Sequence, residues 1–138
     1  MTPRKQEKIF EKKYANDLLT IAKEEYATAT ALVGIENIRI EHVFYLAQQV
    51  IEKSLKAVLV HSETPVPMIH DLAALVAKLP DDHTPPYGYE MGELTMYATI
   101  RRYEVSTLRP TADELTIVLA KTKEILNWAQ EIIEQTAT

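Results

Sequence analysis

One segment restricts the fold more than any other: the stretch from Phe44 to Val60, which reads FYLAQQVIEKSLKAVLV. Its apolar residues recur at steps of three and four, whereas Gln48, Glu52 and Lys56 follow one polar line. This spacing predicts an α-helix with a single apolar stripe. Such a stripe has to be buried, so the chain needs partner elements with matching apolar faces.

The rest of the chain repeats this pattern between its prolines. Proline interrupts helices and strands alike. Six of the seven prolines divide the chain at three places: Pro65 and Pro67, then Pro80, Pro85 and Pro86, then Pro110. Between these breaks, the apolar spacing predicts four long helices and a short one, at residues 5–33, 44–60, 70–79 (the short helix), 90–105 and 111–133.

Two helix ends carry capping signals. Gly34 follows the first helical pattern and suits the left-handed conformation of a C-terminal cap. Thr111 and Glu114 after Pro110 match a capping box, in which each side chain satisfies an orphaned backbone amide. With short connections and no period-two alternation, we predict an all-α, up-and-down four-helix bundle with one short extra helix, as a single domain spanning 1–138.

Composition narrows the functional classes. The 138 residues include no cysteine, which excludes disulfides and thiolate metal sites and fits a cytoplasmic protein. No stretch reaches the roughly 20 apolar residues of a membrane helix, so we expect a soluble protein without membrane contact. The formal net charge of −5 opposes general binding to nucleic acid, so any anion site must be local.

The four histidines show no metal-binding pattern. None follows a glutamate by three residues, and no phosphate-binding loop or nucleophile elbow occurs. We therefore expect no metal, no cofactor and no catalytic residue of a metalloenzyme or nucleotide hydrolase.

Three motifs in order, AQQVIEKSLKAVLV from Ala47, HDLAAL from His70 and RRY from Arg101, resemble the HEPN family of higher eukaryotes and prokaryotes. The resemblance extends from about Phe10 to Gln135. It implies a helical bundle that commonly forms a two-fold homodimer, is often encoded beside a minimal nucleotidyltransferase, and is associated with nucleotide or RNA binding.

Many HEPN members are ribonucleases whose arginine is followed, after four to six residues, by a histidine. The arginine holds the phosphate and the histidine transfers the proton. After Arg102 these places hold Thr107, Leu108 and Arg109, and the last histidine of the chain is His83. We predict that the family's metal-independent ribonuclease activity is absent.

Arg101, Arg102, Tyr103 and Lys53 are the candidate ligand-binding residues. Two guanidiniums and an aromatic ring at a helix end can grip a phosphate and stack a base. The alternative is that one arginine is solvated, the other pairs with Glu104 or a bundle carboxylate, and Tyr103 packs in the core. Glu104 stands where the family usually has proline, and its charge weakens a phosphate role.

Further polar residues are candidates for structural or interface roles. The charged ones on the second helix can line a polar groove or a dimer seam, or form an ordinary solvated face, whereas the two glutamines beside its apolar stripe can bond across a neighbouring helix. The two at the start of the short helix can cap it or bond to the second helix, with ligand binding as the alternative. They are Gln48, Gln49, Glu52, Lys56, His70 and Asp71.

The sequence thus favours a dimeric module that binds a nucleotide or RNA, as accessory to a separate nucleotidyltransferase. Two alternatives stay open: a ribonuclease toxin of a toxin–antitoxin pair, and a dimeric scaffold with no small ligand.

Overall fold

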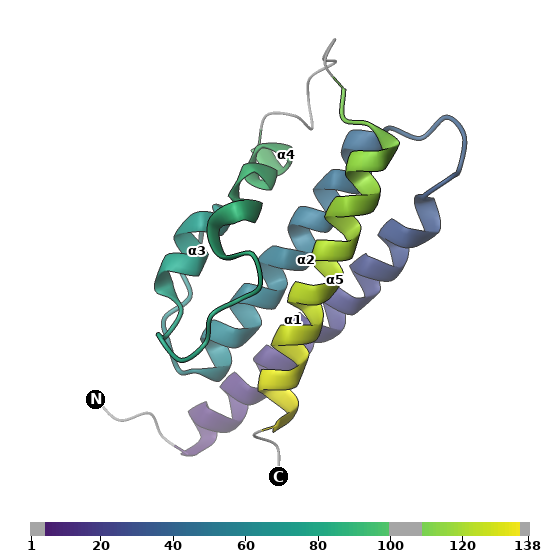
Figure 1. Ribbon diagram of the computed structural model, residues 1–138. Helices are drawn as coiled ribbons and strands as arrows, with labels where there is room; N and C mark the ends of the chain where they lie inside the picture. The colour runs from purple at the N-terminus through teal and green to yellow at the C-terminus, as the bar shows by residue number, and fades with distance from the viewer. Residues whose placement is uncertain (1–4, 100–108, 136–138) are drawn as a thin grey trace.

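The computed structural model describes residues 5–99 and 109–135 (Figure 1). Its elements, in chain order, are α1 (Lys5–Leu32), α2 (Ile40–His61), α3 (Leu72–Lys78), the 3-10 helix η1 (Gly88–Leu94), α4 (Thr95–Thr99) and α5 (Ala112–Gln135). Within these two ranges there is no strand. The predicted all-α class is confirmed.

Helix α2 lies at the centre of the bundle. The long helices α1 and α5 run beside it, while α3, η1 and α4 pack on its other side (Figure 1). The core forms two connected clusters of buried residues, both of which include α2 side chains. Ile51, Leu55 and Leu59 are at most 1 % exposed. Burial of each such side chain stabilises the fold by roughly 1.5–3 kcal/mol. The apolar stripe that the sequence predicts for residues 44–60 therefore lies at the centre of the core.

The caps follow the sequence closely. Gly34 has a φ of +87°, as predicted for the end of α1. The Glu114 backbone N–H donates to Thr111 Oγ1 at 3.1 Å. The carboxylate half of the capping box differs, because Glu114 accepts from the Thr111 hydroxyl at 3.2 Å rather than from the Thr111 amide.

The fourth predicted helix, residues 90–105, needs a correction at its start. The chain turns through positive φ at Tyr87 and Gly88, continues as a 3-10 helix, and becomes α-helical only at Thr95. Two glycines lower the α-helical propensity here, and η1 packs closely on α3, where a Cβ on Gly92 would lie 3.4 Å from Cβ of Ala73. The expected continuation from residue 100 to 105 lies outside the described residues.

None of the helices described is both long and apolar enough to cross a membrane.

Candidate functional site

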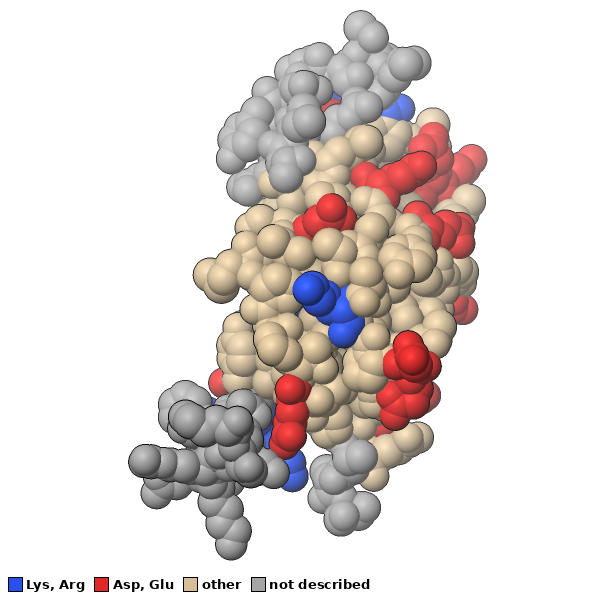
Figure 2. Space-filling model, turned by 90° about the vertical axis from the view of Figure 1, so that its left-hand side faces the viewer, with Lys and Arg blue, Asp and Glu red and all other residues tan. Residues whose placement is uncertain are grey.

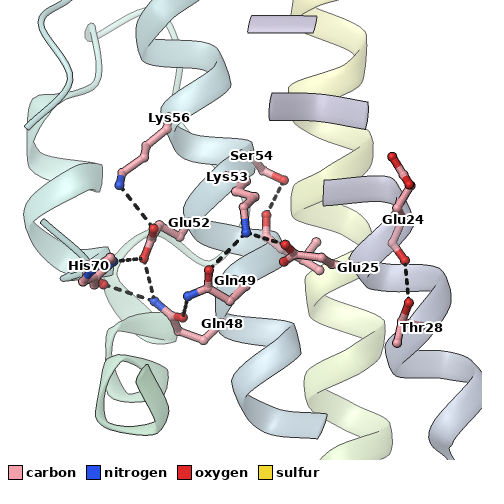
Figure 3. A network of polar contacts seen from close by, with 11 residues as sticks. Glu24, Glu25, Thr28, Gln48, Gln49, Glu52, Lys53, Ser54, Lys56 and His70 are labelled. Carbon is pink, nitrogen blue, oxygen red and sulfur yellow. Dashed lines mark hydrogen bonds and ion pairs between the residues drawn. The ribbon is translucent and has the colours of Figure 1, made fainter. Parts of the chain in front are cut away.

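A polar network lies along the flank of α2, within the bundle (Figure 3). It contains Gln48, which is fully buried, and Glu52, which is 4 % exposed. Their spacing of four residues puts both on one face of the helix. A buried carboxylate is costly unless hydrogen bonds and positive charge surround it, so its partners define what this flank does.

Glu52 has three such partners. Its Oε1 accepts from Gln48 Nε2 at 3.1 Å and bonds Nδ1 of His70 at 3.0 Å, while its Oε2 pairs with Lys56 Nζ at 3.2 Å. Because a carboxylate only accepts, the bond assigns the ring proton to Nδ1. The His70 side chain is 62 % exposed, so its other nitrogen faces solvent.

Gln48 joins this network to the segment that precedes α3. Its Nε2 also donates to the backbone carbonyl of His70 at 3.2 Å, and its Oε1 accepts from Gln49 Nε2 at 2.7 Å. Both the nitrogen and the oxygen of the Gln48 side-chain amide therefore form hydrogen bonds inside the bundle. Together with Glu52 it fastens the residues before α3 onto α2.

Lys53 points the other way, toward α1. Its Nζ forms an ion pair with Glu25 and a hydrogen bond of 3.1 Å to Gln49 Oε1 (Figure 3). The lysine and glutamate side chains are 19 % and 23 % exposed, and Glu25 Oε2 is buried without a hydrogen-bond partner. The ammonium that we considered for ligand binding thus lies between two helices, beside a carboxylate.

Asp71 stands apart from the network, although it follows His70 directly. It is the N-cap of α3, and its Oδ1 accepts from the Ala74 backbone N–H at 3.3 Å. The next amide, of Leu72, donates to Thr95 Oγ1 at 3.0 Å. These bonds start α3 and connect it to α4.

A second buried carboxylate, Glu41, was missed by the sequence reasoning. Arg109 binds it with Nη2 at 2.7 Å from Oε1 and Nε at 3.2 Å from Oε2, and Arg39 lies 3.6 Å from Oε2. Burial alone raises the pKa of Glu41, but the hydrogen bonds from Arg109 and its own backbone amide, with the charges of both arginines, outweigh it. The pKa is therefore lowered.

The pairing of Glu41 with Arg109 had little signal in the sequence. Glu41 lies in the first turn of α2, where a negative charge is favourable. Its arginine partner is 68 residues away. Arg109 lies just before α5, and it reaches Glu41 because α5 packs against α2.

The candidates Arg101, Arg102 and Tyr103 lie outside the described residues. The chain leaves the described part at Thr99, the last residue of α4, and re-enters it at Arg109. In the described part, no group of three histidine, aspartate or glutamate side chains is arranged to hold a metal ion.

Comparison with known proteins identifies one family. The profile of the HEPN domain matches residues 15–133, from α1 to near the end of α5. No curated protein and no solved structure matched this chain. Since the match covers nearly the whole chain, and the helical bundle agrees with it, this protein belongs to the HEPN domain family.

Proposed function

We propose that this protein is a HEPN-type module that binds a nucleotide or RNA, as a homodimer and as accessory to a separate minimal nucleotidyltransferase. The observation that carries the proposal is the HEPN match over residues 15–133, combined with the absence of any histidine after His83. HEPN domains are associated with nucleotides and RNA, and this chain has no histidine within reach of the family's arginine spacing. Binding without cleavage accounts for both facts.

The distribution of arginines supports a local anion site in an acidic protein. Arg39 and Arg109 meet at Glu41, with side chains 34 % and 50 % exposed. Arg101 and Arg102 occur in the nine residues that separate Thr99 from Arg109. Guanidiniums hold phosphates through paired hydrogen bonds, so this stretch is where we expect the ligand.

The polar flank of α2 contributes to the fold rather than to phosphate binding. Lys53 is paired with Glu25 and Lys56 with Glu52, and each lysine is less than one fifth exposed. A phosphate brought to this flank would meet two carboxylates as well as two ammonium groups. We therefore propose that Arg102 and Tyr103 bind the ligand and that Lys53 mainly holds α1 against α2.

Isothermal titration of the full chain with ATP, other nucleotides and short single-stranded RNA tests the proposal. We expect saturable binding that Arg102→Ala weakens about 10-fold or more, the scale of a lost charge-assisted contact. Lys23→Ala, which removes an exposed positive charge on α1, serves as the matched control and should leave affinity nearly unchanged.

Two results would contradict the proposal. One is the absence of binding to every nucleotide and RNA, with and without a candidate nucleotidyltransferase. The other is specific RNA cleavage by the purified protein that Arg102→Ala abolishes, which would make it a ribonuclease. Light scattering at micromolar concentration tests the dimer, and a clean monomer would remove that part of the proposal.

A further inference from the structure

A pocket of about 250 Å³ lies where η1 and α4 meet the first turns of α5, with Phe44 of α2 as part of its lining. Most of its lining is apolar and comes from three parts of the chain. These residues are Phe44, Leu94, Met96, Tyr97, Ile117 and Val118.

The apolar lining is partly open to water. Ile117 is 56 % and Met96 38 % exposed, while the rings of Phe44 and Tyr97 stack at 5.0 Å between centroids. Single exposed apolar residues are common on proteins. Here, however, they surround one hollow with an aromatic floor and a flexible methionine, which is the composition of a site that receives an apolar group.

The same pocket is bordered by two carboxylates, Glu93 and Glu114. Neither forms an ion pair in the part of the chain that the structure describes, whereas Glu41, Glu52 and Glu90 each have a cationic partner. Figure 2 views the molecule from the side of α3 and α4, where acidic side chains lie along the right-hand edge and at places within the face, and a basic group lies near its middle. The pocket therefore offers two carboxylates with no cationic side chain beside them among the described residues, although Glu114 also accepts from the Thr111 hydroxyl at the start of α5.

We propose that this pocket docks a segment of a partner protein in which a large apolar side chain stands next to a lysine or arginine. The apolar group fills the hollow, and the cation lies between the two carboxylates. Opposite charges of this kind steer encounter and set specificity.

The volume and charge of the pocket favour an apolar side chain next to a cation over a phosphate-bearing ligand. Pockets for drug-sized molecules measure roughly 300–1,000 Å³, so about 250 Å³ suits one large side chain. Glu93 and Glu114 would repel phosphate. The proposal therefore does not depend on nucleotide or RNA binding, and each can fail without the other.

NMR of the full chain with labelled methyl groups tests the pocket directly, because Ile117 and Met96 report from its lining. We would titrate three probes of similar shape: phenethylammonium, the neutral phenethyl alcohol and the anionic hydrocinnamate. We expect the methyl signals to move with an affinity order of cation, neutral, anion, and with about 3- to 10-fold between the cation and the anion, as expected for exposed charge pairs.

Variants of Glu93 and Glu114 test whether these carboxylates cause the affinity order of the three probes. The double change Glu93→Gln and Glu114→Gln should make the three probes bind alike, whereas Glu131→Gln, the same change at an exposed site farther along α5, should leave the order intact. Pocket methyls that do not respond, or an anion that binds as well as the cation, would overturn the proposal.

Selection from a random peptide-display library for binding to the full chain then identifies the type of segment that occupies the pocket. We expect enriched peptides to pair an apolar with a basic residue and to be displaced by phenethylammonium. Enrichment of no peptide despite amine binding would assign the pocket to a small amine. Pocket signals that move with protein concentration alone would assign it to a second copy of this chain. Either result would overturn the proposal.

Discussion

Two glutamates on α2, Glu41 and Glu52, are equally buried at 4 % exposure but are compensated in different ways. Glu41 lies at the beginning of the helix and is held by Arg39 and Arg109, whose side chains reach in from solvent. Glu52 lies in the middle of the helix, and one of its partners, Gln48, is itself fully buried.

We expect from this difference that the position of the partners, more than the burial of the carboxylate, determines what removal of the carboxylate costs in stability. An arginine that loses Glu41 can return to water. The buried Gln48 amide cannot: its bond to the His70 carbonyl remains, but the N–H that donates to Glu52 loses its acceptor, and an unsatisfied buried donor carries a desolvation penalty. The two sites therefore differ in kind: one ties the end of the bundle through exposed guanidiniums, and the other depends on the buried Gln48 amide, with His70 joining it from the surface.

The largest expected effect is that of Glu52→Ala. The substitution removes the acceptor of Gln48, His70 and Lys56 together, so we expect a loss of about 3–5 kcal/mol in the free energy of unfolding at neutral pH. Denaturant unfolding followed by circular dichroism measures it. Glu24→Ala, an exposed glutamate on α1, is the control and should change stability by less than about 0.5 kcal/mol.

Glu41→Ala should cost less, about 1–2 kcal/mol at neutral pH. Its two arginine partners are partly exposed and regain water when the carboxylate is gone. The same unfolding experiment compares it with Glu52→Ala. If Glu41→Ala proved as destabilising as Glu52→Ala, burial of the carboxylate would outweigh the position of its partners, and the comparison above would be wrong.

The sequence predicted those features that depend on neighbouring residues. The period of α2 and the cap at Gly34 are set within a few turns of chain. Glu41 with Arg109, and Lys53 with Glu25, are 68 and 28 residues apart, and both pairs depend on how helices pack. The 3-10 start at Gly88 also depends on packing, because η1 lies against α3.

The candidate site was predictable to a smaller degree. Glu52 and Lys56 lie four residues apart, a spacing that favours an ion pair on one helix face, and they form that pair. The sequence analysis allowed His70 a bond to the second helix, but it did not show that this bond goes to Glu52 or that Gln48 joins it, since the segment before α3 reaches α2 only in the folded chain. The roles of Arg102 and Tyr103 stay predictions, because both lie outside the described residues.

The lowered pKa of Glu41 makes its contribution to stability depend on pH. The folded-state pKa of Glu41 lies below its ordinary value of 4.5. Its contribution to stability is therefore fully present above about pH 4.5 and is lost as the pH falls through the lowered pKa. The stability difference between the wild type and Glu41→Gln, measured by unfolding from pH 7 to about pH 3, should shrink over that acidic range.

Arg109→Ala sharpens this test. Without the hydrogen bonds and charge of Arg109, the pKa of Glu41 rises. The acid-induced loss of stability that Glu41 causes should then be smaller than in the wild type, because its folded-state pKa lies closer to that of the unfolded chain, while at neutral pH Arg39 and the start of α2 still favour the ionised carboxylate. NMR titration of the Glu41 side chain measures the shift directly. An unchanged pKa would mean that Arg109 does not hold this carboxylate.

The smallest effect should come from Lys56→Met, which removes one cation from Glu52 but leaves its hydrogen bonds with Gln48 and His70. Lys56 is 14 % exposed, so methionine can keep the packing of its aliphatic chain. We expect a loss below about 1 kcal/mol, close to that of a partly exposed ion pair. A loss as large as that of Glu52→Ala would show that the ammonium charge, rather than the hydrogen bonds, makes the buried Glu52 tolerable. The comparison of the two glutamates would then reduce to one rule, in which both depend on a neighbouring positive charge.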